Sequence, residues 1–115
     1  MGFQEEQAPY KKVAIEFATY LVNREYKKAF NMLSLDQQKK YTAILLEKNM
    51  NEMTDYFEDN KNIWVETESM DEYGATSDKR IYVSIAEDCN LEAITVDICY
   101  EDEKACIGNI EWGRP

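Results

Sequence analysis

Apolar residues recur at helical spacing in the first half of the chain. After Pro9, which suits the first turn of a helix, they occupy positions i, i+3, i+4 and i+7, as expected for one buried helix face. The residues that share this spacing are Ala14, Phe17, Ala18 and Leu21. Asn23 is expected to end the helix, and the same spacing over 26–33 predicts a second, shorter helix.

A third helix is predicted to begin near Ser34 or Asp36, because either side chain can accept a hydrogen bond from a free backbone N–H of the first turn. The pattern predicts an apolar face made of Tyr41, Ile44, Leu45 and the stem of Lys48. The stretch 50–57 either continues this helix or forms a short helix of its own. Its methionines, Met50 and Met53, are interpreted as core residues.

The second half alternates between apolar and polar positions, which is the pattern of β-strands. Four strands separated by short turns are predicted, over 63–70, 79–86, 91–100 and 105–112. Short turns join antiparallel neighbours, so these strands are expected to form a four-stranded antiparallel meander. The predicted fold class is therefore α+β, with N-terminal helices packed on a four-stranded antiparallel sheet.

The chain of 115 residues is long enough for one hydrophobic core and too short for two domains. We expect one domain over 9–115, with helices in about 9–59 and the sheet in about 62–113. Residues 1–8 are polar and acidic, and are expected to form a flexible lead that lacks the features of a signal peptide. No apolar run approaches the roughly 18 residues that a membrane helix needs. A cytoplasmic protein is expected.

Alternation also divides the predicted sheet into two faces. The face toward the helices consists of isoleucine and valine residues, namely Ile63, Val65, Ile81, Val83, Ile85, Ile94, Val96 and Ile98. The opposite, outer face then carries Trp64, Glu66, Glu68, Tyr82, Ser84, Thr95 and Asp97. In the last strand, the pattern leaves open whether Ile110 with Trp112 or Asn109 with Glu111 join the outer face.

Acidic residues outnumber basic ones by 23 to 13, which gives a formal net charge of −10. The charge is uneven, because residues 61–115 hold 13 acidic and 5 basic side chains, whereas residues 1–60 hold 10 and 8. A chain this acidic repels phosphate backbones and anionic lipid, so neither nucleic acid nor a membrane is an expected partner. A protein with a basic surface is the expected partner.

Few residues in the chain suit catalysis or metal binding. There is no His, and Cys89, Cys99 and Cys106 lack the number and spacing of zinc ligands. No phosphate-binding loop or nucleophile–base pair occurs, so no enzyme, metal or cofactor is expected. Asp97 could serve as a general base, but alternation favours a position for it in solvent or at an interface. The cysteines are expected to be reduced thiols, with a disulfide between strand neighbours as the alternative.

Residues 14–33, AIEFATYLVNREYKKAFNML, followed by further helices and then by a strand meander, resemble the NTF2-like superfamily, a cystatin-like α+β cone. The shared features are Ala and Phe in a first helix, then a polar-Tyr step into Ala-Phe and Met-Leu. The resemblance implies a strongly curved sheet packed on helices. It does not select a function, because the superfamily includes enzymes, small-ligand binders, scaffolding modules and bacterial immunity proteins.

These features favour a non-enzymatic acidic binding protein. A small acidic domain can block a basic, nuclease-type bacterial toxin by charge complementarity, as immunity proteins of this fold do. One alternative is a small-ligand binder or enzyme that uses the pocket of the cone. Enzymatic members often pair Asp with His in that pocket, whereas this chain would depend on Asp97, Tyr41, Tyr82 or Tyr100. The other alternative is a dimerising module, which repulsion between two acidic faces disfavours, so a monomer or weak homodimer is expected.

The partner-binding surface is predicted on the outer face of the sheet and on the acidic turn after 91–100. Aromatic side chains there supply contact area, and carboxylates supply electrostatic steering. An ordinary solvated sheet face, on which aromatic residues only support strand pairing, is the alternative interpretation. The predicted binding residues are Trp64, Glu66, Glu68, Tyr82, Asp97, Glu101, Asp102 and Glu111.

Overall fold

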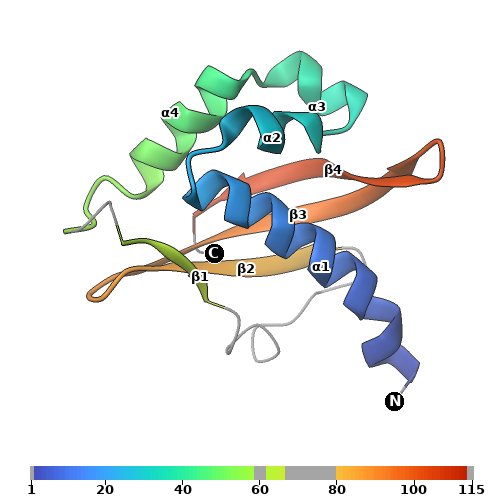
Figure 1. The fold of residues 1–115 in the computed structure, drawn as a ribbon, viewed down its shortest axis with the longest axis horizontal. Helices are drawn as coiled ribbons and strands as arrows, with labels where there is room; N and C mark the ends of the chain where they lie inside the picture. The colour runs from blue at the N-terminus through green and yellow to red at the C-terminus, as the bar shows by residue number, and fades with distance from the viewer. Residues whose placement is uncertain (1, 59–61, 67–79, 114–115) are drawn as a thin grey trace.

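The computed structural model describes residues 2–58, 62–66 and 80–113. Four helices come first, namely α1 (Gly2–Val22), α2 (Tyr26–Asn31), α3 (Leu35–Lys40) and α4 (Ala43–Met53). Four strands follow, namely β1 (Trp64–Glu66), β2 (Arg80–Ala86), β3 (Leu91–Glu101) and β4 (Lys104–Trp112). The predicted fold class, α+β with helices before an antiparallel meander, is confirmed (Figure 1).

The strands lie in the order β1-β2-β3-β4, each antiparallel to its neighbour. Helix α1 crosses one face of the sheet, α3 packs against β4, and α4 packs mainly on α2 (Figure 1). A short parallel bridge between Leu33 and Ile107 attaches the α2–α3 connection to the edge of β4. Its two backbone hydrogen bonds, from Ser34 N to the Ile107 carbonyl and from Ile107 N to the Met32 carbonyl, are both 2.8 Å long. The helices therefore cover one face of the sheet, and we refer to the opposite face as the outer face.

The helix-covered face of the sheet is apolar, as predicted. Six of the residues assigned to it are at most 3% exposed, namely Ile81, Val83, Ile85, Ile94, Val96 and Ile98. Ile63 and Val65 are half-buried against the same core. The predicted face of the first helix is fully buried as well, at Ala14, Phe17, Ala18 and Leu21. Removal of this apolar surface from water is the main force that holds α1 on the sheet.

A β-bulge in the β3–β4 ladder determines which residues of β4 face outward. Val96 lies opposite Ile110, which is 7% exposed and belongs to the core. Because side chains alternate along a strand, Asn109 and Glu111 lie on the outer face, which decides the alternative left open by the sequence. The unpaired residue at the bulge is Gly108.

Helix α1 begins at Gly2, well before the start predicted at Pro9. Residues 2–8, which were expected to form a flexible lead, are helical. Glutamine, glutamate and alanine dominate 4–8 and have high helix propensity. A proline inside a helix removes one backbone hydrogen bond, and here it does not end the helix.

The predicted third helix is in fact two helices. Ser34 Oγ accepts a hydrogen bond from the Gln37 N–H at 3.2 Å, which confirms one of the two predicted caps and starts α3. The backbone is extended at Tyr41 and Thr42. Thr42 Oγ1 then accepts a hydrogen bond from the Leu45 N–H at 3.1 Å and starts α4. A second capping residue therefore restarts the helix after one interruption.

This restart changes which residues of α4 are buried. Leu46 and Met50, four residues apart on one helix face, are buried in the core. Ile44, which was predicted to face the core, is 78% exposed. The prediction was wrong at Ile44 because it extended one helical pattern across the interruption at Thr42.

The boundaries of the sheet agree closely with the sequence. β2, β3 and β4 match their predicted ranges to within one residue at each end. The first predicted strand is represented by β1, while Glu68 and the predicted turn over 71–78 lie outside the described residues. Among the described helices, none combines the length and apolar character needed to cross a bilayer.

Candidate protein-binding surface

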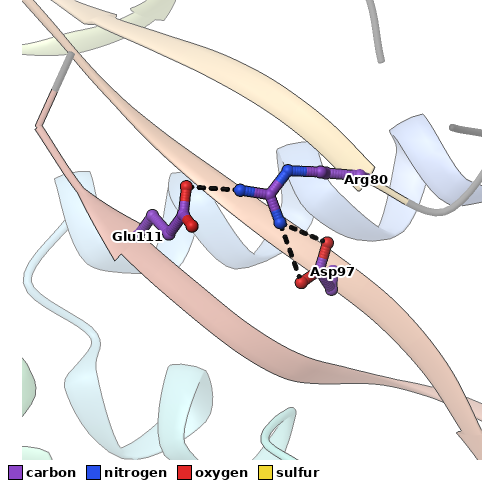
Figure 2. A network of polar contacts seen from close by, with 3 residues as sticks. All are labelled: Arg80, Asp97 and Glu111. Carbon is purple, nitrogen blue, oxygen red and sulfur yellow. Dashed lines mark hydrogen bonds and ion pairs between the residues drawn. The ribbon is translucent and has the colours of Figure 1, made fainter. Parts of the chain in front are cut away.

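Three strands contribute to an ion-pair network around Arg80 on the outer face (Figure 2). Arg80 Nη1 lies 3.1 Å from each carboxylate oxygen of Asp97, and Nη2 donates to Glu111. Arg80 and Asp97 are direct partners in the β2–β3 register, which explains their contact. The hydrogen bond to Glu111 and, next in importance, the charge of Asp97 raise the pKa of Arg80.

This network changes the interpretation of two predicted binding residues. Asp97 and Glu111 lie on the outer face as expected, but the guanidinium of Arg80 balances one of their two charges. Asp97 is 37% exposed and pairs with the cation of Arg80. It therefore lies at the surface, which is the position that alternation favoured when a role as general base was the other interpretation. Arg80 was absent from the predicted set, although alternation places it on the same face as Tyr82.

The centre of the outer face is not an open, solvated surface. Ser84 and Ala93 are cross-strand partners there, and both are 0% exposed. The Ser84 hydroxyl makes no hydrogen bond within the described residues. Tyr82 is half-buried on the same face. A partner would therefore meet the outer face mainly at its edge strands, where Trp64 of β1 and Glu111 of β4 are exposed.

The acidic turn between β3 and β4 contains one carboxylate with an internal role. Both oxygens of Glu101 lie 3.2 Å from the backbone N–H of Leu35, at the start of α3. A carboxylate is favoured there because the first N–H groups of a helix have no partner within the helix. Asp102 and Glu103 are exposed, and both have positive φ angles, 51° and 65°. Of the predicted residues in this turn, Asp102 is therefore the one whose carboxylate stays at the surface.

A second acidic region lies at the opposite end of the sheet, where α4 ends, β1 begins and β2 turns into β3 (Figure 1). Tyr56, which follows α4, donates its hydroxyl to Glu92 Oε2 at 2.7 Å, and the same hydroxyl lies 3.1 Å from the Leu91 carbonyl oxygen. Its ring packs edge-on against Phe57, with the ring centroids 5.2 Å apart. These contacts hold 54–58 against the start of β3 and leave Tyr56 48% exposed.

The β2–β3 turn adds further carboxylates to this region. Glu87 Oε1 accepts hydrogen bonds from the Cys89 backbone N–H at 3.0 Å and from Asn90 Nδ2 at 2.6 Å, which stabilise the turn. The charge of Glu58 is the largest of the causes that raise the pKa of Cys89, so Glu58 lies beside the same turn. Asp88, within the turn, is exposed.

Strand β1 brings an aromatic residue to this end of the sheet. Trp64 lies opposite Ala86 in the β1–β2 register and is 41% exposed. Its indole Nε1 lies 3.5 Å from Glu66 Oε2. We refer to the residues gathered here as the acidic end, which consists of Tyr56, Glu58, Trp64, Glu66, Glu87, Asp88 and Glu92.

The acidic end unites charges that are scattered along the sequence. Its segments, 54–58, 62–66 and 86–92, together contain six Asp or Glu and no Lys or Arg. The predicted set included Trp64 and Glu66, and it missed Tyr56, Glu58, Glu87, Asp88 and Glu92. One signal was present in the sequence, because no basic residue occurs anywhere in 81–103. The contact between Tyr56 and Glu92, which are 36 residues apart, corresponds to no pattern in the sequence around either residue.

The hollows near the helix–sheet interface bear on the alternative of a small-ligand site. One measures about 50 Å³, well below the roughly 300 Å³ at which ligand pockets begin. A surface groove of about 420 Å³ lies between α1, α2 and β4, and its polar lining includes Glu16, Tyr20, Lys28 and Lys104. The polar residues expected to act in a cone pocket line neither of these two hollows; they are Asp97, Tyr41, Tyr82 and Tyr100. Within the described ranges, no three His, Cys, Asp or Glu side chains are grouped so as to hold a metal ion.

Comparison with known proteins gave no match: no family model, no curated protein and no solved structure matches the chain. The NTF2-like resemblance and the immunity function therefore stay predictions. The architecture itself is a small α+β fold, in which helices precede a four-stranded antiparallel sheet.

Proposed function

We propose that this chain is a non-enzymatic inhibitor that binds a basic protein through the acidic end. The class we propose is that of bacterial immunity proteins against nuclease-type toxins, on an NTF2-like cone. One observation carries this proposal: two exposed aromatic side chains lie at the same end of the sheet, Tyr56 on the helix-covered side and Trp64 on the outer face, in segments that contain Asp and Glu but no Lys or Arg. Aromatic residues of this kind are frequent centres of binding energy at protein interfaces.

The charge of the acidic end acts mainly on the rate of association. Glu58, Asp88 and Glu92 produce a negative potential that a basic surface meets before the two proteins touch. Salt shortens the range of this potential, to about 10 Å at 0.1 M ionic strength. Binding that depends on it should therefore slow as salt is added.

The charge of the whole chain supports a nuclease as the partner. A nuclease needs a basic surface to attract the phosphate groups of its substrate. A compact domain of net charge −10 can compete with the nucleic acid for that surface. Inhibition by covering the surface needs contact and no catalytic residue. The cytoplasm is the compartment we propose, since a nuclease toxin acts there on the nucleic acid of the cell.

The proposed binding set differs from the one predicted from the sequence. Arg80 offsets part of the charge of Asp97 and Glu111, and Glu101 binds the start of α3 at the other end of the sheet, so we assign these three residues a smaller part in binding. We propose that the chain is a monomer or a weak homodimer, and that one chain binds one partner molecule. The residues that form the proposed contact are Trp64 and Glu66 from the earlier set, with Tyr56, Glu58, Asp88 and Glu92 in addition.

The proposal predicts that a neighbouring gene encodes a basic domain, and the test uses that domain together with the purified full chain. The nuclease activity of that domain is measured on RNA and on DNA while the chain is added in increasing amounts. The expected result is a loss of activity that is complete at one equivalent of the chain. Full nuclease activity in the presence of an excess of the chain would contradict the proposal.

A pair of aromatic variants tests the surface itself. Trp64→Ala should raise the dissociation rate by about 30-fold, which corresponds to about 2 kcal/mol, because an aromatic contact is lost from the interface. Tyr100→Ala is the matched control, since Tyr100 is 50% exposed and lies near the other end of β3. It should leave dissociation unchanged. Equal effects of the two variants would show that the acidic end is not the binding surface.

A further inference from the structure

Cys99 and Cys106 face each other across the β3–β4 ladder, close to the hairpin that joins these strands (Figure 1). They are direct partners in the register, and their Sγ atoms lie 3.1 Å apart. Cross-strand partners have Cα atoms about 4.5–5.5 Å apart, within the roughly 4.4–6.8 Å that a disulfide spans. A bond between these two sulfurs therefore needs a small side-chain movement and no rearrangement of the strands.

The surroundings confine both thiols to this position. Cys106 is 7% exposed and Cys99 is half-buried. Cys106 Sγ also lies 3.5 Å from the Cys99 carbonyl oxygen. The bulge residue Gly108 leaves room for the Cys99 side chain, because a Cβ at 108 would come within 3.0 Å of Cys99 Sγ. The register and the bulge thus act together to bring the two sulfurs into contact.

We propose that Cys99 and Cys106 are a disulfide-forming pair that closes by exchange with a low-molecular-weight disulfide such as oxidised glutathione. The Cys99 thiolate attacks one sulfur of the glutathione disulfide, and one glutathione thiolate leaves. Cys106 then attacks Cys99 Sγ in the mixed disulfide, and the second glutathione thiolate leaves. Each cysteine loses one proton and the two leaving thiolates take up two, so two protein thiols are oxidised while one glutathione disulfide is reduced to two glutathione thiols.

The order of the two attacks follows from the different positions of the two sulfurs. Cys99 is the more exposed of the pair, so the external disulfide reaches it first. Burial, with the hydrogen bond to Cys99 as the next cause, raises the pKa of Cys106 to about 12. Thiolate is the attacking species in exchange, and little of it forms at Cys106 near neutral pH. The mixed disulfide on Cys99 should therefore accumulate before the second step closes the bond.

The third cysteine provides a control within the same chain. Cys89 is exposed in the β2–β3 turn, at the opposite end of the sheet from the β3–β4 turn near which Cys99 and Cys106 lie (Figure 1). The charge of Glu58, with smaller contributions that include Glu87 and Asp88, raises the pKa of Cys89. The same carboxylates repel glutathione, which is itself an anion. Cys89 should therefore stay a thiol, although it is the most exposed of the three.

The test is a redox titration of the reduced full chain with mixtures of oxidised and reduced glutathione at about pH 8, where exchange is fast enough to follow. Samples are quenched with acid, the free thiols are alkylated, and the intact mass and disulfide-linked peptides are measured. The expected product carries one alkyl group, on Cys89, and a Cys99–Cys106 link. A product that keeps three alkylated thiols when oxidised glutathione is in large excess, or a link that includes Cys89, would overturn the proposal.

Two serine variants separate the steps, and a third serves as the control. Cys106→Ser should stop at a glutathione adduct on Cys99, because no second thiol is available to displace it. Cys99→Ser should react at least tenfold more slowly, since only the buried Cys106 remains in the pair. Cys89→Ser should close its disulfide as fast as the unchanged chain. Equal rates of adduct formation in Cys99→Ser and Cys106→Ser would contradict the assigned order.

Discussion

Tyr56 and Glu92, 36 residues apart in the sequence, are joined by a hydrogen bond of 2.7 Å from the phenol hydroxyl to a carboxylate oxygen. This bond attaches the segment after α4 to the start of β3. It brings the carboxylates of 54–58 and 86–92 to one end of the sheet, where the pairing of β1 with β2 also places Trp64. The proposed binding surface therefore depends on a tertiary contact that the local sequence pattern does not contain.

Tyr56→Phe tests this contact. The variant keeps the ring but loses the hydroxyl, so the free energy of unfolding should fall by about 0.5–1.5 kcal/mol, the usual contribution of one hydrogen bond. Equilibrium unfolding in urea measures the change. Tyr20→Phe is the control, because the Tyr20 hydroxyl makes a longer contact, 3.3 Å, to Glu16 Oε1 within the same helix and joins no separate segments, so its removal should cost little. An unchanged midpoint in Tyr56→Phe would contradict the assigned role.

Charge reversal at the acidic end should slow association with the basic partner. Glu58→Lys combined with Asp88→Lys should lower the association rate by about tenfold at low salt and weaken its dependence on salt, because the steering charge is lost. Surface plasmon resonance at two salt concentrations measures both effects. Glu16→Lys with Glu25→Lys makes the same change in net charge on the helical half, and is expected to change the rate much less. A control pair that slows binding as strongly would place the contact elsewhere.

Removal of the central cation of Figure 2 should destabilise the protein in a salt-dependent way. In Arg80→Gln, Asp97 and Glu111 lose their shared partner and repel each other. The melting temperature should fall, and added sodium chloride should restore part of the loss by screening. Lys27→Gln, an exposed position on α2, removes the same charge without breaking a network and is the control. A loss that salt does not reduce would argue against repulsion as the cause.

Alkaline pH should destabilise the reduced protein. Burial raises the pKa of Cys106 from 9.0 to about 12, so the folded state holds this proton more tightly than the unfolded state does. The associated stability is fully present below about pH 9 and is lost as the pH rises toward about 12. Burial also raises the pKa of Tyr26, which acts in the same direction. Urea unfolding at increasing pH measures the slope, which should be shallower in Cys106→Ala than in the unchanged chain. Parallel slopes would contradict the role assigned to Cys106.

The β3–β4 turn should accept glycine with a gain in stability. Glu103 has a φ of 65°, in the left-handed region that side chains disfavour. Glu103→Gly should raise the free energy of unfolding by about 0.5–1 kcal/mol, since glycine adopts this conformation without steric cost. Glu103→Gln removes the same charge but keeps the Cβ, so it isolates the backbone effect and should leave the melting temperature nearly unchanged. If both variants stabilise equally, charge rather than conformation is responsible.

The sequence by itself determined the order of the elements and the buried face of the sheet. Strand alternation and helical spacing are local patterns, so Phe17 in α1 and Val83, Val96 and their neighbours in the sheet were assigned correctly to the core. The α+β fold class and the ends of β2, β3 and β4 followed from the same patterns. The helix break at Thr42 was missed, because one capping hydroxyl outweighed an apolar pattern that continued across it.

Only the tertiary structure decided how the outer face and the candidate binding surface are built. The bulge at Gly108 selected the outward residues of β4, and Arg80 joined carboxylates from two other strands. The acidic end arose from contacts between 54–58, β1 and the β2–β3 turn. Each of these arrangements depends on the register and packing of segments that lie far apart along the chain. Hydrophobic and polar patterns specify which face of its own helix or strand a residue occupies. Which residue of another element it contacts is determined only when the elements pack together.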